Sequence, residues 1–231
     1  MDDGATDRKR RRVKRSVAPA APDLTDELGI LGEAPLDLRG VQILEQHLVG
    51  LDLSELNGEG VLLAECRVEN VDLSGAALRR SSMRDLVVDG GSWANVDVTE
   101  ATLQRVELRN VRLTGAVLAG VSLRDVSFVD CRMDLAAIRF GRLERVRFEN
   151  CRMDEIDLYE AKLSSVVLAG CGLTNASLAK AAFSSCEMHE CDLDGIGNPE
   201  QLRGVGMPWP DIVRSAAVLA AAAGVHVVDT Q

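Results

Sequence analysis

Hydrophobic residues recur every five positions along most of the chain, and this period is the strongest signal in the sequence. From Leu48 to Leu193, 30 positions have numbers ending in 3 or 8, and 29 of them are apolar, the exception being Gly58. Two residues before each of these lies a second regular position, where 22 of 30 residues are Ala, Val or Cys. The other three places of each five are mostly polar, charged or glycine.

A period of five matches neither the 3.6-residue repeat of a helix nor the two-residue alternation of a strand. One small and one large apolar residue in every five indicate a chain that turns a corner after each five residues. Both apolar residues then face an interior, while the remaining three face water. The pattern predicts a solenoid, in which each coil buries the exposed face of its neighbour.

Several five-residue units carry a recognisable motif, including "VDLSG" (71–75), "IDLYE" (156–160) and "CDLDG" (191–195). They resemble the pentapeptide-repeat family, whose loose motif is Ala-(Asp/Asn)-Leu-X-X, and the resemblance covers roughly residues 36–197. It implies an all-β solenoid: a right-handed, four-sided parallel β-helix of about eight coils, with four pentapeptides in each coil.

We divide the chain into four parts on this basis. Residues 1–21 are expected to be a disordered basic arm and a Pro/Ala linker, and residues 22–35 an N-terminal cap. In the cap, Asp23 is expected to begin a short helical turn that Gly29 ends. Residues 36–197 form the β-helix, and residues 198–231 a C-terminal capping or dimerisation segment.

The C-terminal segment contains a predicted helix at 210–223, with Pro210 in its first turn and Gly224 just past its end. An apolar stripe at helical spacing could cover the last coil of its own chain or join a second copy. Pentapeptide-repeat proteins that dimerise typically do so through this end, so the resemblance keeps a homodimer open. The stripe consists of Ile212, Val213, Ala216, Leu219 and Ala220.

All six cysteines fall on the small inward position, and four of them recur at intervals of 20 residues. Residues 20 apart stack on successive coils, so these cysteines are expected to form a column of small buried side chains. A metal site or a disulfide network would need sulfurs that converge on one point. We therefore predict no metal and no cofactor. The column comprises Cys131, Cys151, Cys171 and Cys191.

The sequence offers no catalytic constellation. No histidine has a plausible catalytic partner, and no phosphate-binding glycine loop or nucleophile motif is present. No apolar run approaches the roughly 18 residues that span a bilayer, and no secretory signal is visible. We expect a cytoplasmic protein that is not an enzyme and has no membrane partner.

Charge is distributed unevenly along the chain. Residues 1–15 hold seven basic and three acidic residues, a net charge of +4. Since the whole chain has a net charge of −10, the remaining residues carry −10 − 4 = −14. The arm is interpreted as a nucleic-acid contact, a contact to an acidic surface, or a solvated tail. The acidic remainder indicates a body that presents negative charge to a partner.

Sorting the outward residues by side gives two adjacent acidic faces, one centred on Phe128 and one on Met133. A third, near-neutral face centred on Ile138 shows outward Phe140 and Tyr159, and exposed aromatics often anchor interfaces. We predict a non-enzymatic protein-binding scaffold that acts through its outer faces. The candidate acidic residues are Glu69, Asp89, Glu107, Asp130 and Glu149 on the first face, and Asp134, Asp154 and Glu155 on the second.

The resemblance also implies an alternative. Some quinolone-resistance members of the family are acidic rods that mimic duplex DNA on DNA gyrase, so this chain could bind that or another type II topoisomerase and modulate it or protect it from inhibitors. A column of Arg112, Arg132 and Arg152 interrupts the acidic faces and is expected to pair with Asp134 and Asp154. Such neutralisation favours the scaffold hypothesis.

Overall fold

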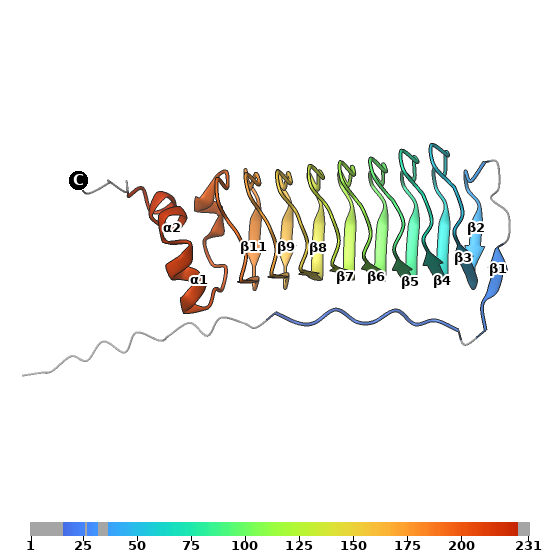
Figure 1. Ribbon diagram of the computed structural model, residues 1–231, viewed down its shortest axis with the longest axis horizontal. Helices are drawn as coiled ribbons and strands as arrows, with labels where there is room; N and C mark the ends of the chain where they lie inside the picture. Colours follow the sequence, from blue (N-terminus) through green and yellow to red (C-terminus); the bar gives the residue numbers. More distant parts are fainter. Residues whose placement is uncertain (1–15, 26, 32–36, 226–231) are drawn as a thin grey trace, which may run out of the picture.

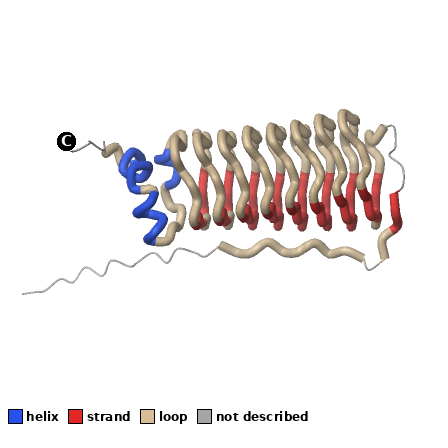
Figure 2. The backbone as a smooth tube through the Cα atoms, viewed as in Figure 1, coloured by secondary structure: helices blue, strands red, loops and turns tan. Residues whose placement is uncertain are grey.

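The computed structural model describes residues 16–25, 27–31 and 37–225, and its centre is a straight rod of stacked coils (Figure 1). The coils contribute to one twelve-stranded sheet, whose strands lie along one side of the rod while loops lie along the other (Figure 2). Its five long strands are β4 (Leu62–Glu69), β5 (Ser82–Asp89), β6 (Thr102–Arg109), β7 (Ser122–Val129) and β8 (Arg142–Glu149).

Shorter elements complete both ends of the rod. The N-terminal strands are β1 (Gly29–Leu31), β2 (Gln42–Leu44) and β3 (Gln46–Val49). The C-terminal strands are β9 (Lys162–Ser164), β10 (Val167–Ala169), β11 (Ala182–Ser184) and β12 (Glu187–His189). They are followed by η1 (Pro199–Leu202), α1 (Trp209–Arg214) and α2 (Ala216–Ala222). Within the described residues, no helix is long and apolar enough to cross a bilayer.

Neighbouring coils pair in parallel with a register of 20 residues. In β4 and β5, Leu63 pairs with Met83, and on the sides without strands single bridges such as Asp97 to Val117 keep the same offset. This register places each large residue above the large residue of the previous coil, as the five-residue period predicts. The parallel β-solenoid of about eight coils is thereby confirmed.

The inward positions form one continuous hydrophobic core. Leu108, at a large inward position, and Cys151, at a small inward position, are each 1% exposed. Phe128 and Phe148, one coil apart, stack with ring centroids 4.9 Å apart and planes 6° from parallel. The core therefore depends on repeated contact between like side chains on successive coils.

The rod has four faces, which we name after the large inward residue in residues 121–140. The Leu123 face and the Phe128 face carry the strands, and the Met133 face and the Ile138 face carry the single bridges. The corners between faces lie at residue numbers ending in 0 or 5, where the backbone takes positive φ. Side chains at these corners project away from the core.

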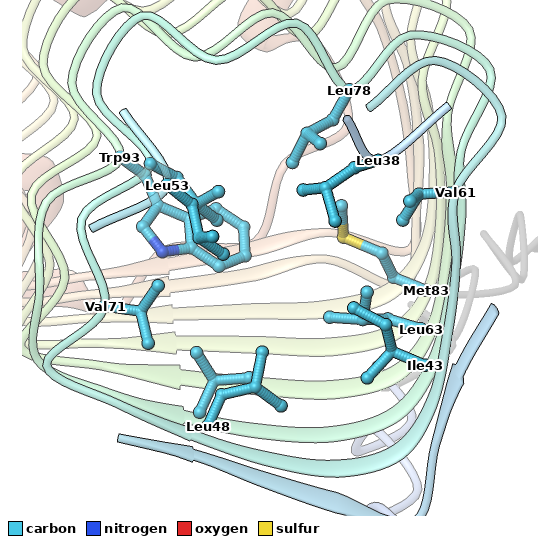
Figure 3. A pocket seen from close by; sticks show the side chains of 12 residues that line it. Leu38, Ile43, Leu48, Leu53, Val61, Leu63, Val71, Leu78, Met83 and Trp93 are labelled. Carbon is cyan, nitrogen blue, oxygen red and sulfur yellow. The ribbon is translucent and has the colours of Figure 1, made fainter. Parts of the chain in front are cut away.

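The first coils enclose a small apolar cavity of about 20 Å³ (Figure 3). Gly58, the exception to the five-residue pattern, lies against Leu78, which lines this cavity. A Cβ at position 58 would lie 2.5 Å from Cδ2 of Leu78, which is too close. Leu78 thus occupies the space that a larger residue at 58 would need. Residues that line the cavity include Leu38, Leu53, Val71, Leu78, Met83 and Trp93.

The N-terminal region differs from its prediction. Residues 22–25, 27 and 28 contain no helix, so the helical turn expected to begin at Asp23 is wrong, and β1 instead pairs with β3 in parallel. Residues 16–25 run along the side of the rod (Figure 1). Pro19 and Pro22 favour an extended chain, and carboxylates of the rod accept its backbone N–H groups. The basic arm at 1–15 lies outside the described residues.

The predicted helix at 210–223 is two helices, α1 and α2, separated at Ser215. Val218 packs against the core, whereas Val213 is 60% exposed and Ala216 is also exposed, so part of the predicted stripe faces water. The orientation of α1 follows from Asp211, whose carboxylate accepts the N–H of Glu190 at 2.8 Å. Within this chain the helices cover the last coil. The remaining stripe residues, Ile212, Leu219 and Ala220, are half-buried.

Candidate interaction surfaces

The buried cysteines occupy packing positions. All six are free, and Cys131 and Cys151 are at most 2% exposed. The Cys151 thiol donates to the carbonyl of Phe128, and burial raises the pKa of the Cys66 and Cys186 thiols. The Cys66 and Cys186 thiols therefore stay protonated, in contrast to the thiolate that binds metals. No group of three or more metal-ligating side chains occurs in the part of the chain that the structure describes.

The "CEMHEC" stretch is divided between the inside and the outside of the rod. Cys186 and Cys191 are buried, while His189 lies at the surface with its Nε2 3.1 Å from a carboxylate oxygen of Glu187. The three side chains do not converge, so this stretch forms no site for a metal ion.

The acidic residues of the Phe128 face are largely engaged by neighbours on the same face. Glu149 lies 2.8 Å from the Arg147 guanidinium, and Glu107 pairs with Arg109. The remaining contacts join Glu69 to His47 at 3.2 Å, Asp89 to the Asn110 amide at 3.1 Å and Asp130 to the Asn150 amide at 3.3 Å. The predicted acidic residues lie together, but local cations reduce their net charge.

On the Met133 face one arginine contacts two carboxylates. The Arg152 Nε lies 2.9 Å from Asp134 and 3.2 Å from Asp154. Arg112 and Arg132 form no ion pair with any residue that the structure describes. The predicted pairing therefore holds for Arg152 and is wrong for the other two arginines, which are both exposed to solvent. Glu155 is exposed at the next corner.

An apolar patch lies on the Ile138 face, and we define it as Val117, Leu135, Phe140 and Tyr159. Phe140 and Tyr159 meet edge to face with centroids 5.5 Å apart, which brings the two predicted aromatics together. Leu135 is 57% exposed and Phe140 54% exposed. Val117 and Leu135 were not predicted as interaction residues, although both hold outward places in the five-residue pattern.

Two patch residues have unusual backbone conformations. Leu135 has φ of 60° and Phe140 has φ of 58°, both in the left-handed region. Bulky side chains are rare there because Cβ approaches the following carbonyl oxygen. Neither residue recovers this strain by burial, because more than half of each remains in water.

Lys180 adds a charge beside the aromatic pair. Its ammonium lies 4.9 Å from the centre of the Tyr159 ring, donates to the phenolic oxygen at 2.6 Å and pairs with Glu160 at 2.9 Å. Tyr159 is therefore held in place from one side by Phe140 and from the other by Lys180. The patch combines an anchored aromatic with exposed apolar neighbours.

The corner between the Leu123 face and the Phe128 face was not predicted as a site. Its charges alternate along successive coils: Asp85, Arg105, Asp125 and Arg145. Arg105 holds Asp85 with two hydrogen bonds of 2.5 and 2.6 Å, and Arg145 holds Asp125 with two of 2.7 and 2.8 Å. These bonds hold the pKa of both carboxyl groups below the ordinary value. The alternation of aspartate and arginine at intervals of 20 residues is visible in the sequence and could have predicted this row of ion pairs.

Family models match the second half of the rod. A model described as "pentapeptide repeat region" matches residues 101–175, and one described as "pentapeptide repeats (8 copies)" matches residues 161–196. No curated protein matches the chain by sequence.

Similar solved structures include full-length QnrB1, a plasmid-mediated fluoroquinolone resistance protein, at 14% identity and a TM-score of 0.36. That match covers 80% of this chain and all (100%) of QnrB1. HetL, from the cyanobacterium Nostoc sp. strain PCC 7120, is a pentapeptide-repeat protein involved in heterocyst differentiation regulation. It matches at 18% identity and a TM-score of 0.27, over 78% of this chain and 93% of HetL.

Proposed function

Because this chain is a pentapeptide-repeat protein, we propose that it is a non-enzymatic protein-binding scaffold that docks a partner protein on the apolar patch of the Ile138 face. The observation that carries this proposal is the pair Leu135 and Phe140. Both are bulky apolar residues at left-handed corners, and both are more than half exposed. Glycine or asparagine would suit such corners better, and apart from the contact of Phe140 with Tyr159 these two side chains remain mostly in water.

The shape of the patch also supports a protein partner. Val117 lies on the middle of the face, one coil away from Ala137, while Leu135 and Phe140 mark the two corners of the next coil. Tyr159 and Phe140 supply aromatic surface, which dominates binding energy at many interfaces. An exposed apolar area beside charged residues such as Lys180 and Glu160 fits the buried centre of a protein–protein contact.

Affinity capture from the native host with matched baits tests this function. The baits are the wild-type chain, Phe140→Asn, Leu135→Asn and the control Ser165→Asn, which changes a corner of the same backbone conformation between the Leu123 and Phe128 faces, away from the patch. We expect a partner that wild type and Ser165→Asn recover equally, and that each patch variant recovers at least about tenfold less. Equal recovery by all four baits, or no specific partner for wild type, would contradict the proposal.

A second candidate is DNA mimicry at DNA gyrase or another type II topoisomerase. It is favoured by one observation, the adjacent acidic faces of a chain whose net charge is −10. The ion pairs of Glu107, Glu149 and Asp134 oppose it, because a phosphate mimic needs unneutralised charge. The scaffold hypothesis therefore remains the first choice.

A supercoiling assay with DNA gyrase separates the two candidates. Arg152→Gln is the informative variant, because it releases Asp134 and Asp154 from their shared cation. A DNA mimic would inhibit gyrase or protect it from drugs, would improve in Arg152→Gln and would weaken with salt. We expect no effect of either protein at micromolar concentration and low salt. Inhibition that grows in Arg152→Gln would replace the scaffold hypothesis with the mimic.

A further inference from the structure

The corner of alternating aspartate and arginine is already occupied by an extended peptide, the N-terminal segment 16–25. The N–H of Ala20 donates to Oδ1 of Asp125 at 3.1 Å, and the N–H of Asp23 donates to Oδ1 of Asp85 at 3.1 Å. Further along, the N–H and hydroxyl of Ser16 both donate to Glu187 at 3.1 Å. The segment thus runs against the direction of the coils, from the C-terminal end toward the N-terminal end (Figure 1).

From Ser16 to Pro22 the segment contacts the rod with a period of three residues, and Leu24 is a further half-buried residue after this stretch. Ser16, Pro19 and Pro22 are half-buried, whereas Val17, Ala18, Ala20 and Ala21 are exposed. Three residues per turn is the period of the polyproline II helix, which the Pro19 to Pro22 spacing favours. The residue after each proline donates its N–H to the rod: Ala20, after Pro19, to Asp125, and Asp23, after Pro22, to Asp85.

The spacing of the acceptors matches this period. Asp85 and Asp125 lie two coils apart, which is about 9.6 Å at ~4.8 Å for each coil. Three residues of polyproline II advance about 9.3 Å at ~3.1 Å for each residue. A chain in this conformation therefore presents one N–H group to each aspartate without strain, provided that it keeps the three-residue repeat.

The acceptors are formed independently of the segment. Each aspartate is held by two hydrogen bonds from the arginine on the next coil, so it keeps its position when the N-terminal segment leaves. The segment itself belongs to no strand and contacts the rod through few residues. A preformed site with a loosely attached occupant permits exchange.

We propose that this corner is a binding site for Pro-x-x-Pro segments in the polyproline II conformation, which residues 16–25 occupy within the chain and which a proline-rich segment of another protein occupies in exchange. Recognition combines two half-buried prolines with two backbone N–H groups that the aspartates accept. The site is built on a different corner from the apolar patch, so it goes beyond the proposed docking function.

Peptide binding to the full chain tests the proposal. The probe is a fluorescent peptide of sequence SVAPAAPDLT, identical to residues 16–25, followed by anisotropy. Ala20→Pro removes the N–H that reaches Asp125 while keeping an extended backbone, and so weakens the resident segment. Ala21→Pro is the matched control, because no hydrogen bond from the Ala21 N–H to a described residue is present. We expect the peptide to bind Ala20→Pro about tenfold more tightly than wild type or Ala21→Pro.

Variants of the corner identify where the peptide binds. In the Ala20→Pro chain, the further change of Asp85→Ala and Asp125→Ala removes both acceptors and should abolish binding, and circular dichroism checks that the rod is retained. A peptide with proline in place of the residues that match Ala20 and Asp23 should not bind. Phe140→Asn should leave binding unchanged, which separates this proposal from the scaffold function. No binding to Ala20→Pro, or binding that survives the two alanines, would overturn it.

Discussion

At the scale of single residues, the corners show how this fold tolerates side chains that most proteins avoid in left-handed backbone. Residues such as Asn70, Asp130 and Glu155 take positive φ along with the glycines. Hydrogen bonds between successive corners, such as Asp130 N–H to Glu149 C=O, hold the conformation. The backbone conformation of each coil is therefore set by hydrogen bonds to its neighbours, and the identity of the corner side chain can vary with the needs of the surface.

Replacement of Leu135 by asparagine is expected to stabilise the rod or leave it unchanged. Asparagine tolerates left-handed backbone, and the strain of the leucine is on the order of 1 kcal/mol. We expect the free energy of unfolding to rise by up to about 1 kcal/mol in chemical denaturation. Val117→Asn, at an exposed position without positive φ, is the control and should show no rise. A loss above about 1 kcal/mol would mean that Leu135 packs against the rod.

The two inward positions are expected to differ sharply in their tolerance of alanine. Leu108→Ala leaves a cavity between coils and should lower the free energy of unfolding by about 2–5 kcal/mol. Cys151→Ala keeps a small apolar side chain and should cost less than about 1.5 kcal/mol. Urea denaturation under reducing conditions measures both. If the alanine at 151 unfolded the protein, the cysteine column would have a role other than packing.

At the scale of elements, helix α1 supplies a hydrogen-bond acceptor that a further coil would otherwise provide at the end of the rod. Along one corner each N–H donates to a carbonyl on the next coil, as Asn150 does to Ala169 and Gly170 to His189. The next coil pairs with β12 only as far as Gly206, whose carbonyl accepts the Met188 N–H, and for Glu190 the Asp211 carboxylate takes the place of the carbonyl. The cap thus satisfies a backbone group that a solenoid end would leave unpaired.

Asp211→Ala should therefore destabilise the C-terminal end. It leaves the Glu190 N–H without its acceptor, and we expect a loss of about 1–3 kcal/mol in the free energy of unfolding. Hydrogen exchange should quicken at Glu190 and in β12 before the middle of the rod is affected. Asp194→Ala, a change of a nearby exposed carboxylate, serves as the control. Unchanged exchange at Glu190 would show that the cap does not depend on this bond.

The N-terminal segment should stay attached to the corner until strongly acidic pH. Hydrogen bonds from Arg105 and Arg145 hold the pKa of Asp85 and Asp125 below the ordinary carboxyl value. A lowered folded-state pKa gives stability that is complete above the unfolded pKa, about 3.9, and is lost as pH falls through the folded-state value. Anisotropy of a label at the N-terminus should thus be constant from pH 7 to about pH 4 and fall below it. Release near pH 6 would exclude the aspartates as the groups responsible.

At the scale of the whole molecule, the rod displays several separate surfaces on one rigid support. The apolar patch and the aspartate–arginine corner lie on different sides of the rod, the acidic faces lie between them, and the coils hold all of them at fixed spacing. The helices α1 and α2 lie across one end and leave Trp209 and Val213 exposed. A scaffold function requires this separation, because each surface then binds without disturbing the core.

The terminal helices are expected to act as a cap within one chain. Light scattering should give a mass near 24.9 kDa at moderate concentration, and Val213→Glu should not change it. Val213 is the suitable position because it is exposed, whereas Leu219 is half-buried beside η1, where a charge would also damage the cap. A mass near twice the chain's that Val213→Glu halves would establish the homodimer instead.

The sequence by itself determined the solenoid, because each inward position obeys a local rule that repeats in every coil. Leu108 and Cys151 are buried for the same reason as residues 20 positions away, so the period was enough to place them. It also placed Phe140 and Tyr159 on the Ile138 face. Only the tertiary structure decided how the surface charges pair, since Arg152 contacts both Asp154, two residues away, and Asp134 on the previous coil, whereas Arg112 and Arg132 form no ion pair with a described residue.

The tertiary structure also decided the course of both ends, where the repeat stops. Residues 16–25 carry no repeat, and their position depends on aspartates 62 and 105 positions away in the sequence. Likewise Asp211 meets Glu190 only because the chain turns back after η1. Contacts within the repeat are set by a constant offset that sequence reveals. Contacts at the ends depend on competition among distant acceptors, which is resolved only when the chain has folded.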